Sequence, residues 1–205
     1  MRPDAIVTQS QCEVCAVSER DLEEALGQWM GAGRPAIVSL TATSLDGVYA
    51  DIARAAAVLG AEPAGVQVVA AMKRRINAIA TRAAAAASRP TIATIEWIDP
   101  LMSGGNWMPE LVEIAGGRNL FGEAGRHSPW LEFDQLAAAD PDVIFIEQAD
   151  VPSLAGRPGW DQMRAVREGR LCSFSAAVND TIVRAGPRLA DGMQAMADCL
   201  ARRSP

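Results

Sequence analysis

Short runs of consecutive apolar residues recur along the chain, separated by stretches with helical periodicity. These runs occupy 5–8, 36–40, 91–95, 143–146 and 171–174. A strand needs apolar residues on consecutive positions, rather than on alternate ones, when helices cover both faces of its sheet. The alternation of such strands with helices therefore predicts an open α/β fold built on a parallel sheet.

Helices are expected wherever a capping residue precedes a periodic stretch. Ser44 is placed to cap a helix reaching about residue 59, and Asp21 another reaching about residue 30. Further helices are expected at 109–115, 132–139 and 187–201.

The helix expected from Pro63 differs from the others in length. Its apolar residues stay on one face to about Ala87, and a helix of about 25 residues spans roughly 37 Å, enough to run from one lobe to another. We therefore predict a partial N-terminal lobe (1–62), a bridging helix (63–88) and a C-terminal α/β lobe (89–205).

Composition excludes several classes of protein. The 205 residues are 49% hydrophobic and 21% charged, as in an ordinary globular protein. The formal net charge is -6, with acids and bases interspersed, so no basic surface for nucleic acid is expected. Residues 1–8 lack the pattern of a signal peptide, so the chain as written is expected to be cytoplasmic.

Four cysteines, at 12, 15, 172 and 199, leave the redox compartment undecided. Cys12 and Cys15 are spaced so that they could share a metal or form a disulfide, which makes a thiol or metal protein one alternative. The other Cys and His residues are His127, Cys172 and Cys199, without a second paired spacing. One histidine leaves few ways to build a Cys–His catalytic pair, so we expect no enzyme.

Several motifs resemble a known family. The segments 96–100 (Glu-Trp-Ile-Asp-Pro) and 104–117 (Gly-Gly-Asn-Trp to Gly-Gly) resemble the second lobe of the cobalamin-binding solute receptors of ABC importers. These receptors are class III periplasmic binding proteins. The segments 128–130, 140–146, 179–180 and 184–187 follow in the family's order, and 11–18 and 39–46 are similar to its first-lobe motifs.

The resemblance implies two Rossmann-like lobes joined by one long helix, with cobalamin or a related corrinoid held between them as transported ligand and no intrinsic cofactor. It also implies an ABC permease as partner. Heme or an iron-siderophore is an alternative ligand, because a fold does not fix its ligand.

The resemblance leaves the first lobe incomplete, because family members begin with roughly 80 further residues. A longer, exported product would be periplasmic or anchored at the cell surface. A partial protein that pairs with another copy through an open sheet edge is a further alternative.

The resemblance also implies ligand contacts. Trp130 is our first candidate for the corrin plane, followed by Trp107 and Trp97 in the adjoining loop motifs. Asp180 and Arg184 could contact amide edges of the ligand, or they could pair with each other. Burial against a neighbouring element is the alternative for Trp130 and for Trp97.

Overall fold

The computed structural model describes residues 3–9, 24 and 35–203, which form two compact units. The first unit ends at Ala71 and the second begins at Met72, within helix α3 (Glu62–Ala84). The helix expected from Pro63 is thus confirmed, while its role as a bridge between lobes stays a prediction. No helix in the described ranges is both long enough and apolar enough to span a bilayer.

The described residues of the first unit form two strands, helix α2 and the start of α3. Strands β1 (Ala5–Gln9) and β2 (Ala36–Leu40) pair in parallel, in register from Ala5 opposite Ala36 to Gln9 opposite Leu40. Helix α2 (Leu45–Val58) begins after Ser44, whose hydroxyl accepts the backbone N–H of Gly47 at 3.1 Å. The expected Ser44 cap is therefore confirmed, and the helix expected from Asp21 lies outside the described residues.

A buried carboxylate ties α2 to the end of β2. The Oδ2 atom of Asp51 accepts the backbone N–H groups of Thr41 and Ala42, each at 2.9 Å, and its other oxygen pairs with Arg54. These bonds satisfy donors that follow the strand and would otherwise be left without a partner. Asp51 therefore fixes the loop between β2 and α2.

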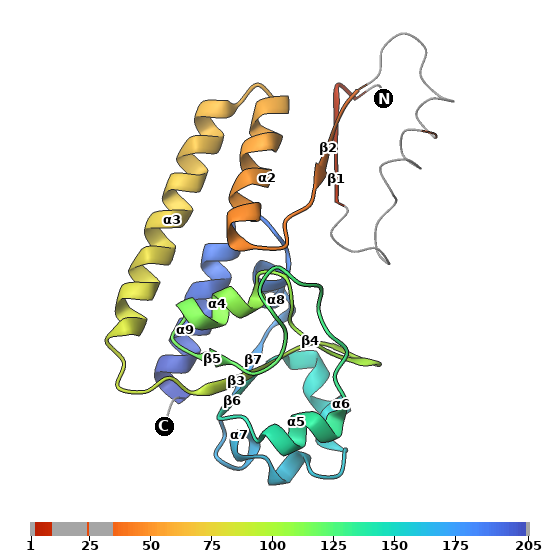
Figure 1. The fold of residues 1–205 in the computed structure, drawn as a ribbon, viewed down its shortest axis with the longest axis vertical. Helices are drawn as coiled ribbons and strands as arrows, with labels where there is room; N and C mark the ends of the chain where they lie inside the picture. The colour runs from red at the N-terminus through yellow and green to blue at the C-terminus, as the bar shows by residue number, and fades with distance from the viewer. Residues whose placement is uncertain (1–2, 10–23, 25–34, 204–205) are drawn as a thin grey trace. The chain divides into compact units, whose positions relative to one another are not determined.

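The second unit is built on a five-stranded sheet with the order β4-β3-β6-β7, and β5 lies beside β3 (Figure 1). Strands β3 (Thr91–Ile98), β5 (Arg118–Asn119), β6 (Val143–Glu147) and β7 (Leu171–Phe174) pair in parallel, and β4 (Leu101–Ser103) is antiparallel to β3. The predicted open α/β architecture and all five predicted strands are confirmed. Strands β4 and β5 were not predicted, because two or three residues are too few to show a period.

Helices cover both faces of this sheet. One face carries α5 (Phe133–Ala139), α6 (Val151–Ala155) and α7 (Arg164–Arg167), and the other carries α4 (Met108–Ile114), α8 (Ala176–Val183) and α9 (Leu189–Arg203) (Figure 1). Two 3-10 turns, Gln148–Asp150 and Trp160–Gln162, complete the unit. The helices expected at 109–115, 132–139 and 187–201 are confirmed within two residues at each end.

The core follows from these layers. Ala93, Ile95, Ile144 and Ile146 point to the α5 side and are at most 7% exposed, and the intervening strand residues are buried on the α9 side. Burial on both faces explains why the strands are apolar on consecutive positions.

A disulfide joins β7 to α9. Cys172 and Cys199 are bonded across 27 residues, with their Cα atoms 6.0 Å apart, and the described residues contain no free cysteine. The sequence left the roles of these two residues open. Because both sulfurs are used, neither Cys172 nor Cys199 is available to complete a metal site with Cys12 and Cys15.

Candidate functional site

Three extended segments lie side by side at the carboxyl end of β3. Trp97 of β3 is the pairing partner of Met102 in β4, and Met102 in turn forms an isolated bridge with Trp130. Directly paired residues of antiparallel segments project from the same face. Trp97, Met102 and Trp130 therefore form a continuous row, which we call the aromatic strip.

The strip is open to solvent. Trp97 is 60% exposed and Trp130 is 63% exposed, and they are the large hydrophobic side chains of the second unit that are exposed in the described residues. Met102 between them is partly exposed. Adjacent exposed apolar side chains of this size make the strip a candidate binding surface, because leaving them in water gives up the stabilisation of burial.

Backbone hydrogen bonds hold the segment that carries Trp130. The N–H of Ser103 donates to the carbonyl of Pro129 at 3.0 Å, and the N–H of Leu131 donates to the carbonyl of Leu101 at 2.9 Å. These two bonds flank the Met102–Trp130 bridge, so the 129–131 segment acts as a short third strand. The indole N–H of Trp97 donates to the carbonyl of Asp99 at 3.0 Å, which orients the other end of the strip.

Ser128 links this third segment to β3. It is 5% exposed; its hydroxyl accepts the N–H of Gly105 at 3.0 Å and donates to Oε2 of Glu96 at 2.7 Å. A Cβ at position 105 would collide with the backbone of Ser128, so the close approach requires glycine. Ser128 lies two residues before Trp130, and its bond to Glu96, the residue before Trp97, links the segment that carries Trp130 to β3.

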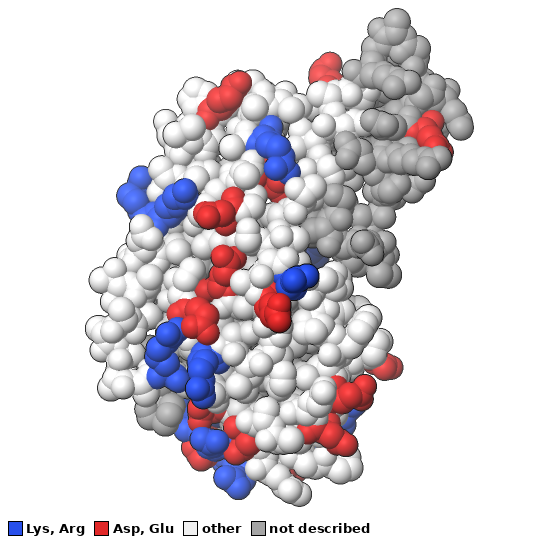
Figure 2. All heavy atoms as spheres, in the orientation of Figure 1, with Lys and Arg blue, Asp and Glu red and all other residues white. Residues whose placement is uncertain are grey.

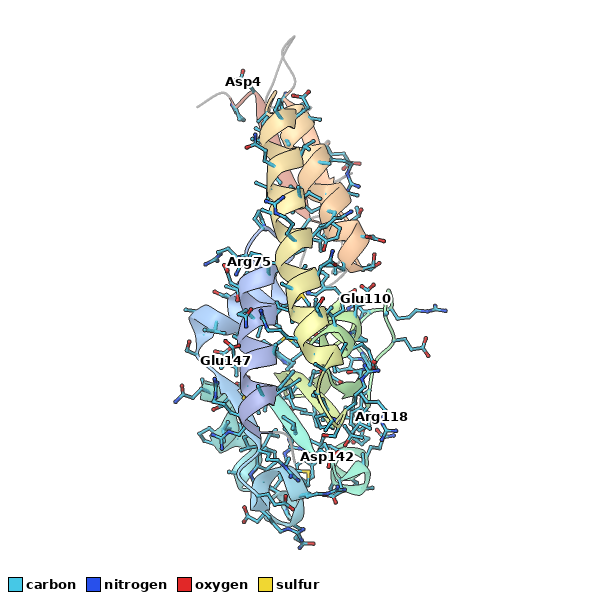
Figure 3. The ribbon with its side chains drawn as sticks, turned by 90° about the vertical axis from the view of Figure 1, so that its left-hand side faces the viewer. Asp4, Arg75, Glu110, Arg118, Asp142 and Glu147 are labelled. Carbon is cyan, nitrogen blue, oxygen red and sulfur yellow. A yellow bond between two sulfur atoms is a disulfide. The ribbon has the colours of Figure 1, made fainter. Side chains whose placement is uncertain are left out.

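Carboxylates lie beside the strip at the same edge of the sheet. Thr94 pairs with Phe145, and two residues further along these strands come Glu96 and Glu147, both partly exposed. Glu147 accepts a hydrogen bond from Nδ2 of Asn179 at 2.8 Å. Within the described part of the chain, neither Glu96 nor Glu147 forms an ion pair with a basic side chain. Figure 3 labels Glu147, the last residue of β6, and Asp142, which directly precedes that strand.

Asp150 follows Glu147 in the 3-10 turn after β6, at the same edge of the sheet. Burial, together with the nearby charge of Glu147, raises the pKa of the Asp150 carboxyl above its usual value. Open α/β sheets bind their ligands at the carboxyl ends of the strands, and the strip and these acids lie at that edge.

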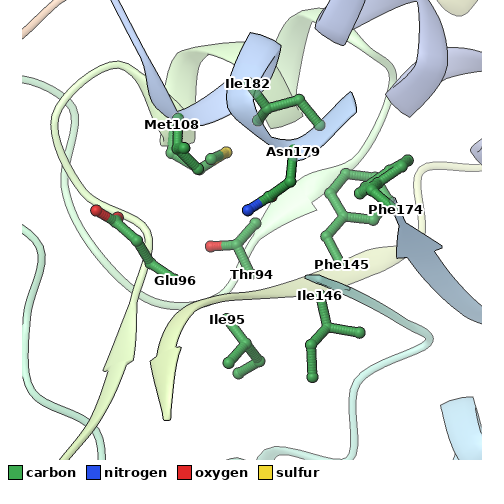
Figure 4. Close-up of a pocket in the computed structure, with 10 residues that line it drawn as sticks. Thr94, Ile95, Glu96, Met108, Phe145, Ile146, Phe174, Asn179 and Ile182 are labelled. Carbon is green, nitrogen blue, oxygen red and sulfur yellow. The ribbon is translucent and has the colours of Figure 1, made fainter. Parts of the chain in front are cut away.

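A small pocket lies behind this edge, beneath α4 and α8. Figure 4 shows Glu96, Thr94 and Asn179 around it, with Met108, Phe145 and Phe174 supplying apolar walls. The pocket has room for about one water molecule. A ligand larger than a water molecule therefore cannot occupy this pocket.

The structure brings together two of the five residues expected to bind ligand, Trp97 and Trp130. Trp107 instead lies in the core, 4% exposed, and its indole N–H donates to the carbonyl of Ile182 at 2.9 Å. Because its ring and its donor are both occupied, we leave Trp107 out of the proposed site.

Asp180 and Arg184 pair with each other, which is the alternative considered from the sequence. The guanidinium Nε of Arg184 lies 2.8 Å from Oδ1 of Asp180 at the end of α8, and both side chains are exposed. Their charges compensate each other, so we leave Asp180 and Arg184 out of the proposed site.

Met102 was missed from the sequence. Its place between the two tryptophans depends on the pairing of β4, and the signal that could have found it was the turn-forming Asp99-Pro100 between two apolar segments.

The described residues offer no metal centre, because they contain no group of three or more His, Cys, Asp or Glu side chains arranged to hold an ion. Cys12 and Cys15 lie outside the described ranges. The ring Nδ1 of His127 lies 2.9 Å from the carbonyl oxygen of Ser128, within hydrogen-bond distance.

The exposed aromatic strip lies at the carboxyl edge of a sheet covered on both faces, which is where open α/β sheets bind ligands. Residues 1–177 match the family model described as "Periplasmic binding protein", and the chain belongs to that family. Membership makes it a binding protein rather than an enzyme, as expected. It implies an extracytoplasmic location, in place of the cytoplasmic location expected for the chain as written. The Cys172–Cys199 disulfide is of the kind that persists in oxidising compartments.

Solved structures of the same fold bind different ligands. The periplasmic heme-binding protein BhuT, in complex with two hemes, superposes with a TM-score of 0.75 at 22% identity over 97% of this chain and 76% of its own. The vitamin B12 binding protein BtuF of Vibrio cholerae gives 0.71 at 19% identity over 98% and 74%.

A third structure, from an ABC-type Fe3+-hydroxamate transport system of Saccharomonospora viridis, gives a TM-score of 0.73 at 19% identity over 97% of this chain and 69% of its own. No curated protein sequence matches the chain. The structural likenesses establish the fold and leave the ligand open.

Proposed function

We propose that this chain is the solute-binding component of an ABC importer and that it binds cobalamin or a related corrinoid on the aromatic strip. The observation that carries the proposal is the row formed by Trp97, Met102 and Trp130, exposed at the carboxyl edge of the sheet. Corrinoid is the cargo in this account, and an ABC permease is the partner that receives it.

The dimensions of the strip fit a flat macrocycle. Neighbouring strands lie about 5 Å apart, so three adjacent segments present a row about 10 Å across. A corrin ring is broad and largely apolar on its faces, and indole rings are flat surfaces that cover such a plane at little cost in conformational entropy. Covering one exposed indole contributes about 2 kcal/mol from apolar burial.

The charges beside the strip favour a corrinoid over heme. The rim of a corrinoid carries neutral amides, whose N–H groups can donate to carboxylates, whereas heme carries two anionic propionates. Glu96 and Glu147 have no ion-pair partner in the described residues, while Arg126 and Arg184 are paired with Glu123 and Asp180. A dianionic rim would meet repulsion at this edge.

The distribution of charged side chains over the surface argues against nucleic acid as a partner. On the described part of the face shown in Figure 2, acidic and basic side chains are interspersed, and no basic stripe follows the surface. Phosphate backbones are bound by clustered Lys and Arg, which that face does not offer.

Calorimetric titration with cyanocobalamin, heme and a ferric hydroxamate in parallel tests the proposal. We expect saturable binding of cyanocobalamin, weakened by roughly tenfold or more in Trp130→Ala and largely retained in Trp130→Phe, which keeps an aromatic plane. Equal affinities for the wild type and Trp130→Ala would show that the strip is not the site. Trp130-dependent binding of heme, with none of cyanocobalamin, would replace the corrinoid by heme.

A further inference from the structure

Met102 differs from the other methionines of the described residues in its exposure. Five of them are buried in the second unit, each at most 6% exposed, at positions 72, 108, 163, 193 and 196. Met102 alone among the described methionines is partly exposed, and it lies between Trp97 and Trp130. Met1 and Met30 lie outside the described residues.

A partly exposed thioether is open to attack by peroxide. Hydrogen peroxide transfers one oxygen atom to the sulfur: the O–O bond breaks, an S–O bond forms, the sulfur is oxidised by two electrons, and water leaves. The product, methionine sulfoxide, is polar where the thioether was apolar. Burial shields the other described methionines from the same reagent.

We propose that Met102 is a site of oxidative modification at which peroxide weakens ligand binding by the aromatic strip. This inference rests on the proposed function. A sulfoxide oxygen in the middle of the strip would lose its hydrogen bonds to water beneath an apolar macrocycle, and the cost of that desolvation corresponds to a loss of roughly tenfold or more in affinity. A bound macrocycle would cover Met102, so ligand should also protect it from oxidation.

The first experiment locates the modification. The intact chain is treated with hydrogen peroxide for increasing times and digested with trypsin, and fragment ions report oxidation at each methionine. Met108 is an internal comparison, because it is buried and lies on the same tryptic peptide as Met102. We expect Met102 to oxidise well before Met108. Equal rates at the two positions would overturn the proposal.

The second experiment measures the effect on binding. Cyanocobalamin affinity is compared before and after peroxide for the wild type and for Met102→Leu, which keeps the apolar bulk without an oxidisable sulfur. We expect peroxide to lower the affinity of the wild type by roughly tenfold and a methionine sulfoxide reductase to restore it. The affinity of Met102→Leu should be the same before and after peroxide.

The outcomes separate the two proposals. Unchanged affinity in wild-type protein that carries Met102 sulfoxide would refute the switch and leave the corrinoid site standing. Failure of the unoxidised wild type to bind cyanocobalamin would refute both the corrinoid site and its control by Met102. The fragment ions decide the site of modification in each case.

Discussion

Removing the Cys172–Cys199 crosslink should lower the free energy of unfolding by about 3.5 kcal/mol. The bond closes a segment of 27 residues, and the chain-entropy relation for a loop of that length gives about 12 cal/mol/K, or about 3.5 kcal/mol at 25 °C. That free energy corresponds to a few hundredfold in the unfolding equilibrium.

The perturbation can be kept close to this single effect. Cys172 is 1% exposed and Cys199 is 7% exposed, so alanine at both positions keeps an apolar contact between β7 and α9. Parent and variant should both carry Cys12→Ser and Cys15→Ser, because no other thiol then responds to a reductant.

Urea unfolding followed by tryptophan fluorescence measures the difference. We expect the Cys172→Ala/Cys199→Ala variant to lose about 3.5 kcal/mol relative to its parent, and dithiothreitol to reproduce the loss in the parent without affecting the variant. A loss below about 1 kcal/mol, the centre of the range for single substitutions, would refute the entropic argument. Two titratable thiols in the unreduced, denatured parent would refute the disulfide itself.

Three other changes test the site and the sheet. Ser128→Ala should cost about 1–3 kcal/mol in urea unfolding, because it strands the buried N–H of Gly105 and removes a bond to Glu96, and calorimetry should show weaker corrinoid binding. Glu96→Gln removes a charge at constant shape, so absorbance titration should show tighter heme binding by about 1 kcal/mol and a smaller change for cyanocobalamin; unchanged heme affinity would contradict the charge argument. Burial acts to raise the pKa of Asp142, but hydrogen bonds from Thr91 and two nearby arginines hold that pKa below its usual value. Its contribution to stability is therefore present above the usual pKa and lost as the pH falls through the lowered value, and Asp142→Asn should flatten the acid limb of the urea midpoint between about pH 5 and 3.

The strands were predictable because burial on both faces leaves a strong local signal. Runs such as 91–95 and 143–146 are apolar at nearly every position, and the structure places their side chains against helices on each side. The signal for the Ser44 cap is also local, because the bond to Gly47 spans only three residues.

The arrangement of the tryptophans was not predictable from local pattern. Trp97, Met102 and Trp130 become neighbours only through antiparallel pairing and a bridge between segments 28 residues apart (102 to 130). Trp107 was predicted as a ligand contact after Trp130 and ahead of Trp97, but its partner is the carbonyl of Ile182, 75 residues away. Sequence therefore indicated the residue types of the site, while long-range pairing decided which of them face solvent.

The cysteines show the same limit. Four cysteines allow three ways of forming two disulfides, and nothing local links Cys172 to Cys199. Their bond depends on α9 packing against β7, a contact between elements that are separated by α8.

The most direct test of the aromatic strip is an NMR titration of the chain with 15N-labelled tryptophan. The indole N–H signals of Trp97, Trp107, Trp130 and Trp160, assigned by substitution, are followed as cyanocobalamin is added. Trp107 and Trp160 are buried, 4% and 2% exposed, and serve as internal controls. We expect the signals of Trp97 and Trp130 to shift together and saturate at one equivalent while those of the buried pair stay in place. Saturable binding that leaves Trp97 and Trp130 unshifted would contradict the proposed role of the strip.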